Sequence, residues 1–333
     1  MCGLFGFSDP CRSLTPRQAR QLLRALAVNS MVRGTDATGI AYNGRDRLHI
    51  YKRAEKASQT LLFPPAGCRV VMGHVRMATQ GNARFNYNNH PFPGDLDNHQ
   101  PSSGPDFALA HNGVLSNDLS LRRRLHLPRT KIETDSYVAV QMLHAAGTLD
   151  MDTLAELAGQ LEGTFTLTLL DKEDTLYFVR GNNPLYLVEF PSLGLFVYAS
   201  TAEILQQAVL SCDFLQTRSF APVWLEEGEI LRLRQDGQMD TRYFSTDKLY
   251  ESMYGFWGWQ TNRRACPNSA FGAAELLDTA CNLGYEEEDV ILLQTCGYFN
   301  EEIEELLQDP ELFRSALQDA YGEFAMYRND YLL

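Results

Sequence analysis

The chain has 333 residues, of which 44% are hydrophobic and 21% are charged, as is typical of a globular protein. Its formal net charge of −13 argues against nonspecific binding to nucleic acids or membranes, because both present anionic surfaces. Seven cysteines without a Cys-x-x-Cys pair argue against a disulfide framework or a zinc site. No apolar run is long enough to span a membrane, and no secretory signal is visible, so we expect a cytoplasmic protein.

The first half of the chain predicts one helix followed mainly by strands. Thr15 directly before Pro16 is a typical helix start, because proline is favoured at the first helical position. The dipeptide Asn43-Gly44 is a strong turn signal, and the apolar segments on either side of it predict a hairpin. The expected elements are a helix over residues 16–29, which buries Leu22, Leu23, Leu26 and Ala27, and strands over residues 40–42, 48–51, 70–75 and 107–110.

The next part of the chain groups its strands and helices separately instead of alternating them. This grouping indicates an α+β protein with antiparallel or mixed sheets covered by helices, and not a doubly wound parallel sheet. A last hairpin is expected around Asp236-Gly237. The expected helices begin at residues 134–135 and cover residues 151–161 and 202–209, and the expected strands cover residues 165–170, 176–180, 185–190, 195–199, 229–233 and 239–243.

The composition changes after about Ser245. Residues 244–259 contain six aromatic side chains, and residues 261–269 are polar. The remainder is acidic with a helical pattern. The favoured interpretation is a generic helical bundle; residues 283–307 also bear a faint resemblance to a ubiquitin-associated-type three-helix domain. The expected helices cover residues 271–282, 286–295, 300–307 and the region 312–331.

Cys2 follows Met1 directly. If Met1 is removed, Cys2 carries a free α-amine next to its thiol, which places a nucleophile and a base in one residue. A thiol has a pKa near ~8.5 and an α-amine one near ~7.7–8.0, so proton exchange between them at neutral pH is easy. The alternative is a small apolar residue buried in the core.

Five further segments contain residue types that suit amide chemistry. Each also has an ordinary structural interpretation: Arg33 and Asp36 as a surface pair, Asn112-Gly113 as a turn, and Asp135 as a helix cap. The segments are residues 33–40 (RGTDATGI), 73–81 (GHVRMATQG), 89–92 (NHPF), 110–115 (AHNGVL) and 133–136 (ETDS).

Taken in order and anchored by Cys2, these segments resemble the motifs of the class II glutamine amidotransferases. These are N-terminal-nucleophile (Ntn) hydrolases, which release ammonia from glutamine. The resemblance covers about residues 2–210. It implies that Cys2 attacks the amide, and that the Asn112 side chain and the Gly113 backbone N–H donate to the oxyanion.

The resemblance also implies how the two ends of glutamine are held. Arg76 would bind the substrate carboxylate with its planar guanidinium, Thr79 would add a hydroxyl, and Asp135 would bind the ammonium. Arg33 would brace the surroundings of the nucleophile. His90 and His111 are expected to support these groups, and no metal or cofactor is needed. The family often has histidine where this chain has Gln80, a departure that concerns the loop after Arg76.

The implied fold is a four-layer αββα sandwich. We expect a glutamine amidotransferase domain over residues 2–245, an aromatic-rich linker over residues 246–270, and a small all-α module over residues 271–333. Residues 246–333 contain neither a P-loop nor a Gly-x-Gly-x-x-Gly pattern, so we expect the enzyme that uses the ammonia to be a separate protein.

Three functions remain open at this point. The chain could be a stand-alone glutaminase that passes ammonia to a separate synthase, which could dock on the C-terminal helices. It could instead hydrolyse a γ-glutamyl amide or an isopeptide without a partner. It could also be a non-enzymatic scaffold that binds through its helical tail.

Overall fold

The computed structural model describes residues 2–45, 47–96 and 104–249 and, in the C-terminal part, residues 276–277, 279–281, 283–295, 303 and 306–329. The chain divides into two compact units, Met1–Gly258 and Trp259–Leu333. Each unit contains an apolar core of its own.

Two sheets form the centre of the first unit, and every strand pairing described in them is antiparallel. The seven-stranded sheet has the spatial order β11 (Ala221–Val223), β9 (Tyr186–Phe190), β10 (Leu195–Ala199), β1 (Gly3–Ser8), β4 (Val70–Arg76), β2 (Ala37–Asn43) and β3 (Leu48–Arg53). The six-stranded sheet has the order β13 (Met239–Tyr243), β12 (Glu229–Leu233), β8 (Leu176–Arg180), β7 (Gly163–Asp171), β6 (Phe107–Leu115) and β5 (Phe92–Gly94).

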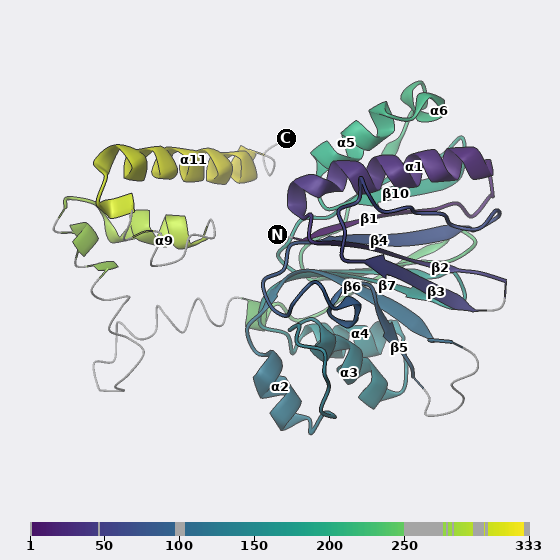
Figure 1. Ribbon diagram of the computed structural model, residues 1–333, viewed down its shortest axis with the longest axis horizontal. Helices are drawn as coiled ribbons and strands as arrows, with labels where there is room; N and C mark the ends of the chain where they lie inside the picture. Colours follow the sequence, from purple (N-terminus) through teal and green to yellow (C-terminus); the bar gives the residue numbers. More distant parts are fainter. Residues whose placement is uncertain are drawn as a thin grey trace. The chain divides into compact units, whose positions relative to one another are not determined.

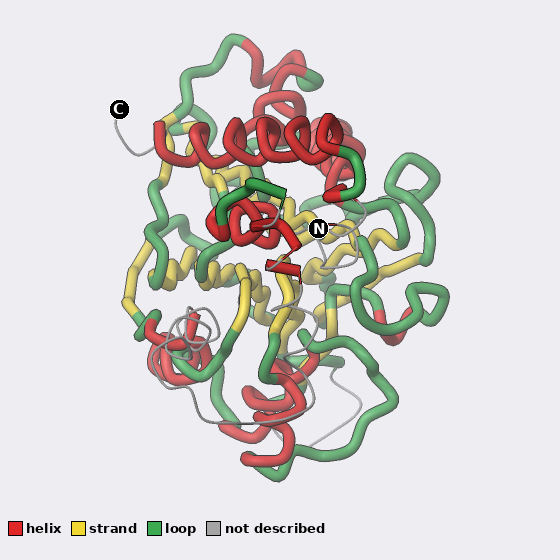
Figure 2. The backbone as a smooth tube through the Cα atoms, turned by 90° about the vertical axis from the view of Figure 1, so that its left-hand side faces the viewer, coloured by secondary structure: helices red, strands yellow, loops and turns green. Residues whose placement is uncertain are grey.

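Helices cover the outer face of each sheet (Figures 1 and 2). On the seven-stranded sheet lie α1 (Pro16–Asn29), α5 (Ala202–Leu210) and the short α6 (Asp213–Gln216). On the six-stranded sheet lie α2 (Asp118–Arg124), α3 (Tyr137–Ala146) and α4 (Met151–Ala158). Three short 3₁₀ helices complete the unit: η1 (Ser30–Arg33), η2 (Asn86–Asn88) and η3 (Asp247–Leu249).

Three apolar cores separate these four layers. Successive residues of β1 enter different cores: Leu4 lies between the two sheets, and Phe5 lies under the helices of the seven-stranded sheet. The same alternation places Ala108 between the sheets and Leu109 under α3 and α4. Because both faces of each sheet are covered, the central strands are apolar on both faces. The expected αββα sandwich is therefore confirmed.

Local sequence signals account for several elements. Thr15 caps α1 in a reciprocal capping box with Gln18, and the four residues expected in the core are fully buried. The β2–β3 and β12–β13 hairpins also form as expected. The strand β1 and the helix α2 were not predicted. In β1, a Cβ on Gly6 would lie 2.2 Å from the carbonyl oxygen of Val71, so glycine permits a close backbone approach there.

The helix expected from residues 134–135 begins later. Its first residue is Tyr137, and it follows a turn in which the Tyr137 N–H donates to the Thr134 carbonyl at 3.3 Å. The Thr134 carbonyl accepts a hydrogen bond from Arg122 at 3.1 Å, and the Asp135 carboxylate accepts one from the Leu115 N–H at 2.6 Å. The helix expected over residues 151–161 ends at Ala158.

The second unit contains α9 (Glu287–Thr295) and α11 (Pro310–Asn329). Tyr285 and Phe313 pack with ring centroids 4.2 Å apart. The predicted helix over residues 286–295 is confirmed, whereas the aromatic stretch 250–259 and most of residues 300–305 lie outside the described residues. The limits at 245 and 270 therefore stay predictions. Within the described residues, every helix is too short or too polar to span a bilayer. The core residues of this unit are Leu276, Ala280, Val290, Leu293, Ile303, Leu307, Phe313, Ala316, Leu317 and Ala320.

Candidate active site

Cys2 lies at the start of β1, in the middle of the seven-stranded sheet. The next residue, Gly3, pairs with Val75 of β4, so the position of Cys2 is fixed by the centre of the sheet. The half-buried Cys2 thiol donates to the carbonyl oxygen of Met77 at 3.4 Å. Burial raises the pKa of this thiol, because the thiolate is poorly solvated there. A reaction at Cys2 therefore needs a base to take the thiol proton.

Arg33 connects Cys2 to the opposite sheet. Its Nε donates to the Cys2 carbonyl oxygen at 2.7 Å, and its Nη2 donates to the Asn112 side-chain oxygen at 3.4 Å. This contact orients the Asn112 amide. The backbone of Asn112 is held in turn by Asn183, whose Nδ2 donates to the Asn112 carbonyl at 2.9 Å. Among the described residues, the buried Nδ2 of Asn112 has no hydrogen-bond partner.

Gly113 follows Asn112 in β6 and has a backbone φ of 141°. L-residues with a side chain rarely adopt this value. A Cβ at this position would also lie 2.0 Å from the carbonyl oxygen of Thr164. Glycine is therefore required at this point of the strand, beside the free amide nitrogen of Asn112.

Arg76 ends β4 and is 2% exposed. Its Nη1 donates to the Asn89 side-chain oxygen at 2.7 Å, and its Nη2 donates to the carbonyls of Gln80 and of Gly81, the latter at 3.0 Å. In the described part of the chain, no carboxylate forms an ion pair with Arg76. A buried guanidinium held only by neutral oxygens is a site suited to an anionic ligand.

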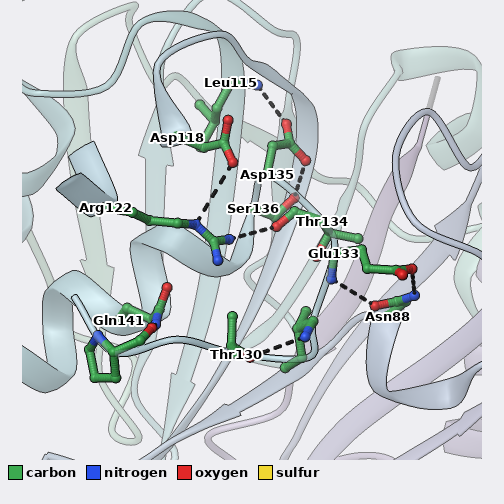
Figure 3. Close-up of polar contacts among 12 residues, drawn as sticks. Asn88, Leu115, Asp118, Arg122, Thr130, Glu133, Thr134, Asp135, Ser136 and Gln141 are labelled. Atoms are coloured by element: carbon green, nitrogen blue, oxygen red, sulfur yellow. Dashed lines mark hydrogen bonds and ion pairs between the residues drawn. The ribbon is translucent and has the colours of Figure 1, made fainter. Parts of the chain in front are cut away.

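Asp135 presents the opposite charge and is 3% exposed. Its carboxylate accepts from the Leu115 N–H and, at 3.2 Å, from the Ser136 hydroxyl (Figure 3). None of the lysines and arginines that the structure describes forms an ion pair with it. This carboxylate is consequently suited to a cationic group of a ligand.

One cavity joins Cys2, Arg76, Gly113 and Asp135. It is lined by Cys2, Arg76, Met77, Thr79, Gln80, His90, His111, Gly113, Thr134, Asp135 and Ser136. Seven of the nine residues predicted from the sequence are in this lining. The other two lie next to the lining: Arg33 contacts the Cys2 carbonyl, and Asn112 contacts Arg33. No cluster of three potential metal ligands occurs among the residues searched, which are the described ones.

The chain is similar in sequence and in fold to known proteins. Residues 94–207 match the sequence model of a family described as "Glutamine amidotransferase domain". The chain carries a glutamine amidotransferase domain.

The glutamine–fructose-6-phosphate aminotransferase of Bacillus licheniformis is 30% identical over 193 residues, which cover 56% of this chain and 30% of that protein. The enzyme of the same name from Halalkalibacterium halodurans is 28% identical over 256 residues, covering 75% of this chain and 40% of that protein. The chain thus matches well under half the length of these relatives. A solved glutamine phosphoribosylpyrophosphate amidotransferase from B. subtilis has a TM-score of 0.56 at 20% identity, over 74% of this chain and 50% of that chain. This similarity shows the shared fold.

Three buried histidines, His74, His90 and His111, lie at or next to the cavity as neutral groups. Burial lowers the pKa of all three, that of His74 to about 3. His74 Nε2 lies 3.0 Å from the His111 carbonyl, so it carries the proton and connects β4 to β6. The ring of His90 packs on that of His74, with centroids 4.3 Å apart. None of them is a strong base at neutral pH.

Several residues that shape the amidotransferase site were not predicted. Met77, Gln80, Thr134 and Ser136 line the cavity, and Ser136 lies 2.7 Å from His111 Nδ1. All four stand directly beside predicted residues, within the segments 73–81 and 133–136, so proximity in sequence was the available signal.

Lys52 is a further residue that the sequence did not single out. Its Nζ donates to the carbonyls of Asn89 and Pro91 at 2.6 and 3.1 Å, on either side of His90. Burial lowers its pKa to about 8. Lys52 therefore supports the segment that holds Arg76 through Asn89.

Proposed function

We propose that the domain hydrolyses the side-chain amide of glutamine to glutamate and ammonia through a thioester on Cys2. One observation carries this proposal: a single cavity is lined by a thiol, a buried cation and a buried carboxylate, and a buried amide donor, Asn112, directly precedes Gly113 of the lining. In the described part of the chain, neither Arg76 nor Asp135 has an ion-pair partner, and the Asn112 amide nitrogen has no hydrogen-bond partner.

Glutamine has the groups that these residues lack. Its α-carboxylate can accept parallel hydrogen bonds from Arg76, and its α-ammonium can bind the Asp135 carboxylate. Thr79, at the rim of the cavity, can donate its hydroxyl to the carboxylate. The side-chain amide would then extend toward Cys2. Binding both ends of the amino acid fixes the amide near the thiol, which converts a bimolecular reaction into an effectively unimolecular one.

The acylation step requires a proton acceptor because the Cys2 thiol is protonated. We assign this role to the α-amine of Cys2 after removal of Met1, since the buried histidines are weak bases. The sulfur attacks the amide carbon, a C–S bond forms, and the C=O electron pair moves to the oxygen. Asn112 Nδ2 and the Gly113 N–H donate to this oxyanion. The amine then protonates the nitrogen, the C–N bond breaks, and ammonia leaves.

The second step returns the enzyme to its starting state. The neutral α-amine takes a proton from water, whose oxygen attacks the thioester carbon. The same two donors hold the second oxyanion. The C–S bond breaks, the thiolate recovers the proton, and glutamate is released. Arg33 supports both steps, because it contacts the Cys2 carbonyl and the Asn112 side chain together.

The test is the intact mass of the purified protein before and after incubation with 6-diazo-5-oxo-norleucine. We expect loss of Met1 and one adduct on Cys2, in which a C–S bond forms and dinitrogen leaves. Release of glutamate from glutamine should accompany it. A chain with a verified Cys2 N-terminus that shows neither an adduct nor glutamate would refute the proposal.

We further propose that the ammonia is used by an acceptor enzyme. Relatives with this domain are named as aminotransferases and amidotransferases, which supports transfer over simple hydrolysis. Glutaminase turnover should rise when the physiological acceptor is added. Faster cleavage of γ-glutamyl amides than of free glutamine would instead favour a hydrolase that needs no acceptor.

A further inference from the structure

Two adjacent asparagines, Asn88 and Asn89, contact the segments that carry the two charged groups of the site. Both are fully buried, with no exposed surface. They stand at the end of η2, and their side chains serve opposite walls of the cavity. Asn89 holds Arg76, and Asn88 contacts the segment that contains Asp135.

On the first wall, Asn89 accepts the 2.7 Å hydrogen bond from Arg76 Nη1. Its own Nδ2 donates to the Ala83 carbonyl at 2.7 Å, which fixes the orientation of the amide. Lys52 holds the Asn89 carbonyl from the other side. The Arg76 guanidinium is thus placed by the position of Asn89.

On the second wall, Asn88 makes a reciprocal pair with Glu133 (Figure 3). Its Nδ2 donates to Glu133 Oε2 at 2.8 Å, and its Oδ1 accepts from the Glu133 N–H at 3.0 Å. Asn88 Nδ2 also donates to the Asn82 carbonyl at 3.2 Å. Glu133 is two residues from Asp135, and Thr134 between them lines the cavity.

The loop that contacts Arg76 is also placed against this pair. Gly81, whose carbonyl accepts from Arg76, lies where a Cβ would be 3.1 Å from the Glu133 side chain and 3.2 Å from that of Asn88. The Asn82 N–H donates to Glu133 Oε2 at 3.3 Å. The contacts of Arg76 and the backbone before Asp135 therefore meet at one side chain, Asn88.

We propose that Asn88 is a positioning residue: by joining η2 to Glu133, it sets the separation between Arg76 and Asp135, and thereby the selectivity of the site for ligands with both a free α-carboxylate and a free α-ammonium group. This inference rests on the proposed function, in which Arg76 and Asp135 bind those two groups. The nucleophile and the oxyanion donors lie on β1 and β6 and do not depend on Asn88. Its loss should therefore weaken recognition of the amino acid and spare the chemistry.

The experiment compares two electrophiles that alkylate Cys2. 6-Diazo-5-oxo-norleucine has the α-carboxylate and α-ammonium groups, whereas iodoacetamide has neither and reacts with loss of iodide. The ratio of the two second-order rate constants measures recognition of the amino-acid end. In Asn88→Ala we expect this ratio to fall about tenfold or more, since an ångström-scale displacement of binding groups has effects of this size. The KM for glutamine should rise while kcat is largely retained.

Asn43 offers a matched control. Its Nδ2 also donates to a backbone carbonyl and to a carboxylate, those of Asp171 and Asp174, at 2.8 and 2.9 Å, but it contacts no residue of the cavity. Asn43→Ala should leave the ratio unchanged. An unchanged ratio in Asn88→Ala would overturn the inference, and so would an equal fall in Asn43→Ala. A wild-type protein that does not react with the diazo compound at Cys2 would instead refute the proposed function itself.

A second pair of variants tests the contact if Asn88→Ala does not fold. Asn88→Asp places two carboxylates against each other, and the ratio should fall. Combining it with Glu133→Gln restores one amide and one carboxylate with their positions exchanged, and the ratio should recover. Recovery in the double variant would support the inference, whereas an unchanged ratio in a folded Asn88→Asp variant would overturn it.

Discussion

The two sheets contribute different halves of the site. The seven-stranded sheet provides the thiol of Cys2 and the guanidinium of Arg76, at the ends of neighbouring strands. The six-stranded side provides Asn112 and Gly113 in β6, and the Asp135 carboxylate just before α3. Neither sheet alone has the proposed nucleophile together with the proposed oxyanion donors, or the buried guanidinium together with the buried carboxylate. The site thus depends on contacts between the sheets.

Two of these contacts are direct. Arg33 joins the Cys2 carbonyl to the Asn112 side chain, and the His74 ring, in the seven-stranded sheet, donates to the His111 carbonyl in the other. Both are buried or partly buried, where hydrogen bonds are less weakened by water. Residues of each half can therefore be replaced separately. Each replacement should change kcat and KM in its own way.

The largest effect is expected when the nucleophile is removed. Cys2→Ala should abolish release of glutamate from glutamine, because no other thiol lines the cavity formed by the described residues. It should also abolish the 6-diazo-5-oxo-norleucine adduct. Circular dichroism should show an unchanged fold, since the Cys2 side chain is only half-buried. Residual turnover above a buffer control would contradict the assignment.

The next largest loss of activity is expected for Asn112, in the six-stranded sheet. Asn112→Ala should lower kcat about 10²- to 10³-fold, as is typical for loss of one oxyanion donor. KM for glutamine should change little, because the donor acts on charge that develops in the transition state. Steady-state kinetics measure both constants. A rise in KM at constant kcat would mean that Asn112 binds the substrate instead.

Replacing Arg76 should change mainly KM, whereas replacing Asn112 should change mainly kcat. Arg76→Lys keeps the charge and loses the planar pair of donors, so KM should rise about 30-fold or more while kcat falls less. Asp135→Asn is the matched variant on the opposite wall and should behave in the same way. If only one of the two raises KM, the substrate is held by a single charge.

Weakening the Arg33 contact between the sheets should lower activity less than loss of Asn112 or Arg76 does. Arg33→Lys retains the charge but cannot reach both Cys2 and Asn112, so kcat should fall about tenfold, as expected for one lost charge-assisted hydrogen bond. The double variant with Asn112→Ala should be no slower than Asn112→Ala alone. Additive losses in this double-mutant cycle would show that Arg33 acts independently of Asn112.

The smallest effect is on pH dependence. Burial raises the pKa of the Cys2 thiol, so its alkylation by iodoacetamide should have a midpoint at higher pH in the native protein than in the urea-unfolded chain. The folded protein keeps the thiol proton to a higher pH than the unfolded chain does. The protonated thiol therefore contributes to the stability of the fold below the pKa that it has in the unfolded chain. This contribution is lost as pH rises through its pKa in the folded protein. Equal midpoints would contradict the burial of the thiol.

Local signals predicted much of the fold. Thr15-Pro16 located the start of α1, and Asn43-Gly44 located the β2–β3 turn, because caps and turns depend on a few neighbouring residues. The strand β1 was not predicted from its pattern. Its glycines weaken the local strand preference, and its pairing with β4 and β10 lies far away in the sequence.

The site, like the fold, was predicted only in part from the sequence. The ordered motifs and Cys2 beside Met1 predicted nine site residues through their resemblance to a known family, and seven of these line the cavity. The start of α3 was placed too early, since Asp135 resembles a helix cap in sequence. In the structure its carboxylate instead accepts from Leu115, a residue 20 positions earlier.

The sequence by itself determined the chemical groups and the elements that carry them. Only the tertiary structure decided which of these groups remain without partners around the cavity and which serve as supports. Asn88 and Asn89 are identical neighbours in sequence, yet one holds Arg76 and the other Glu133. The physical reason is that hydrogen bonds are formed wherever packing brings donors and acceptors together, and residues 76, 89 and 133 meet only when the chain has folded.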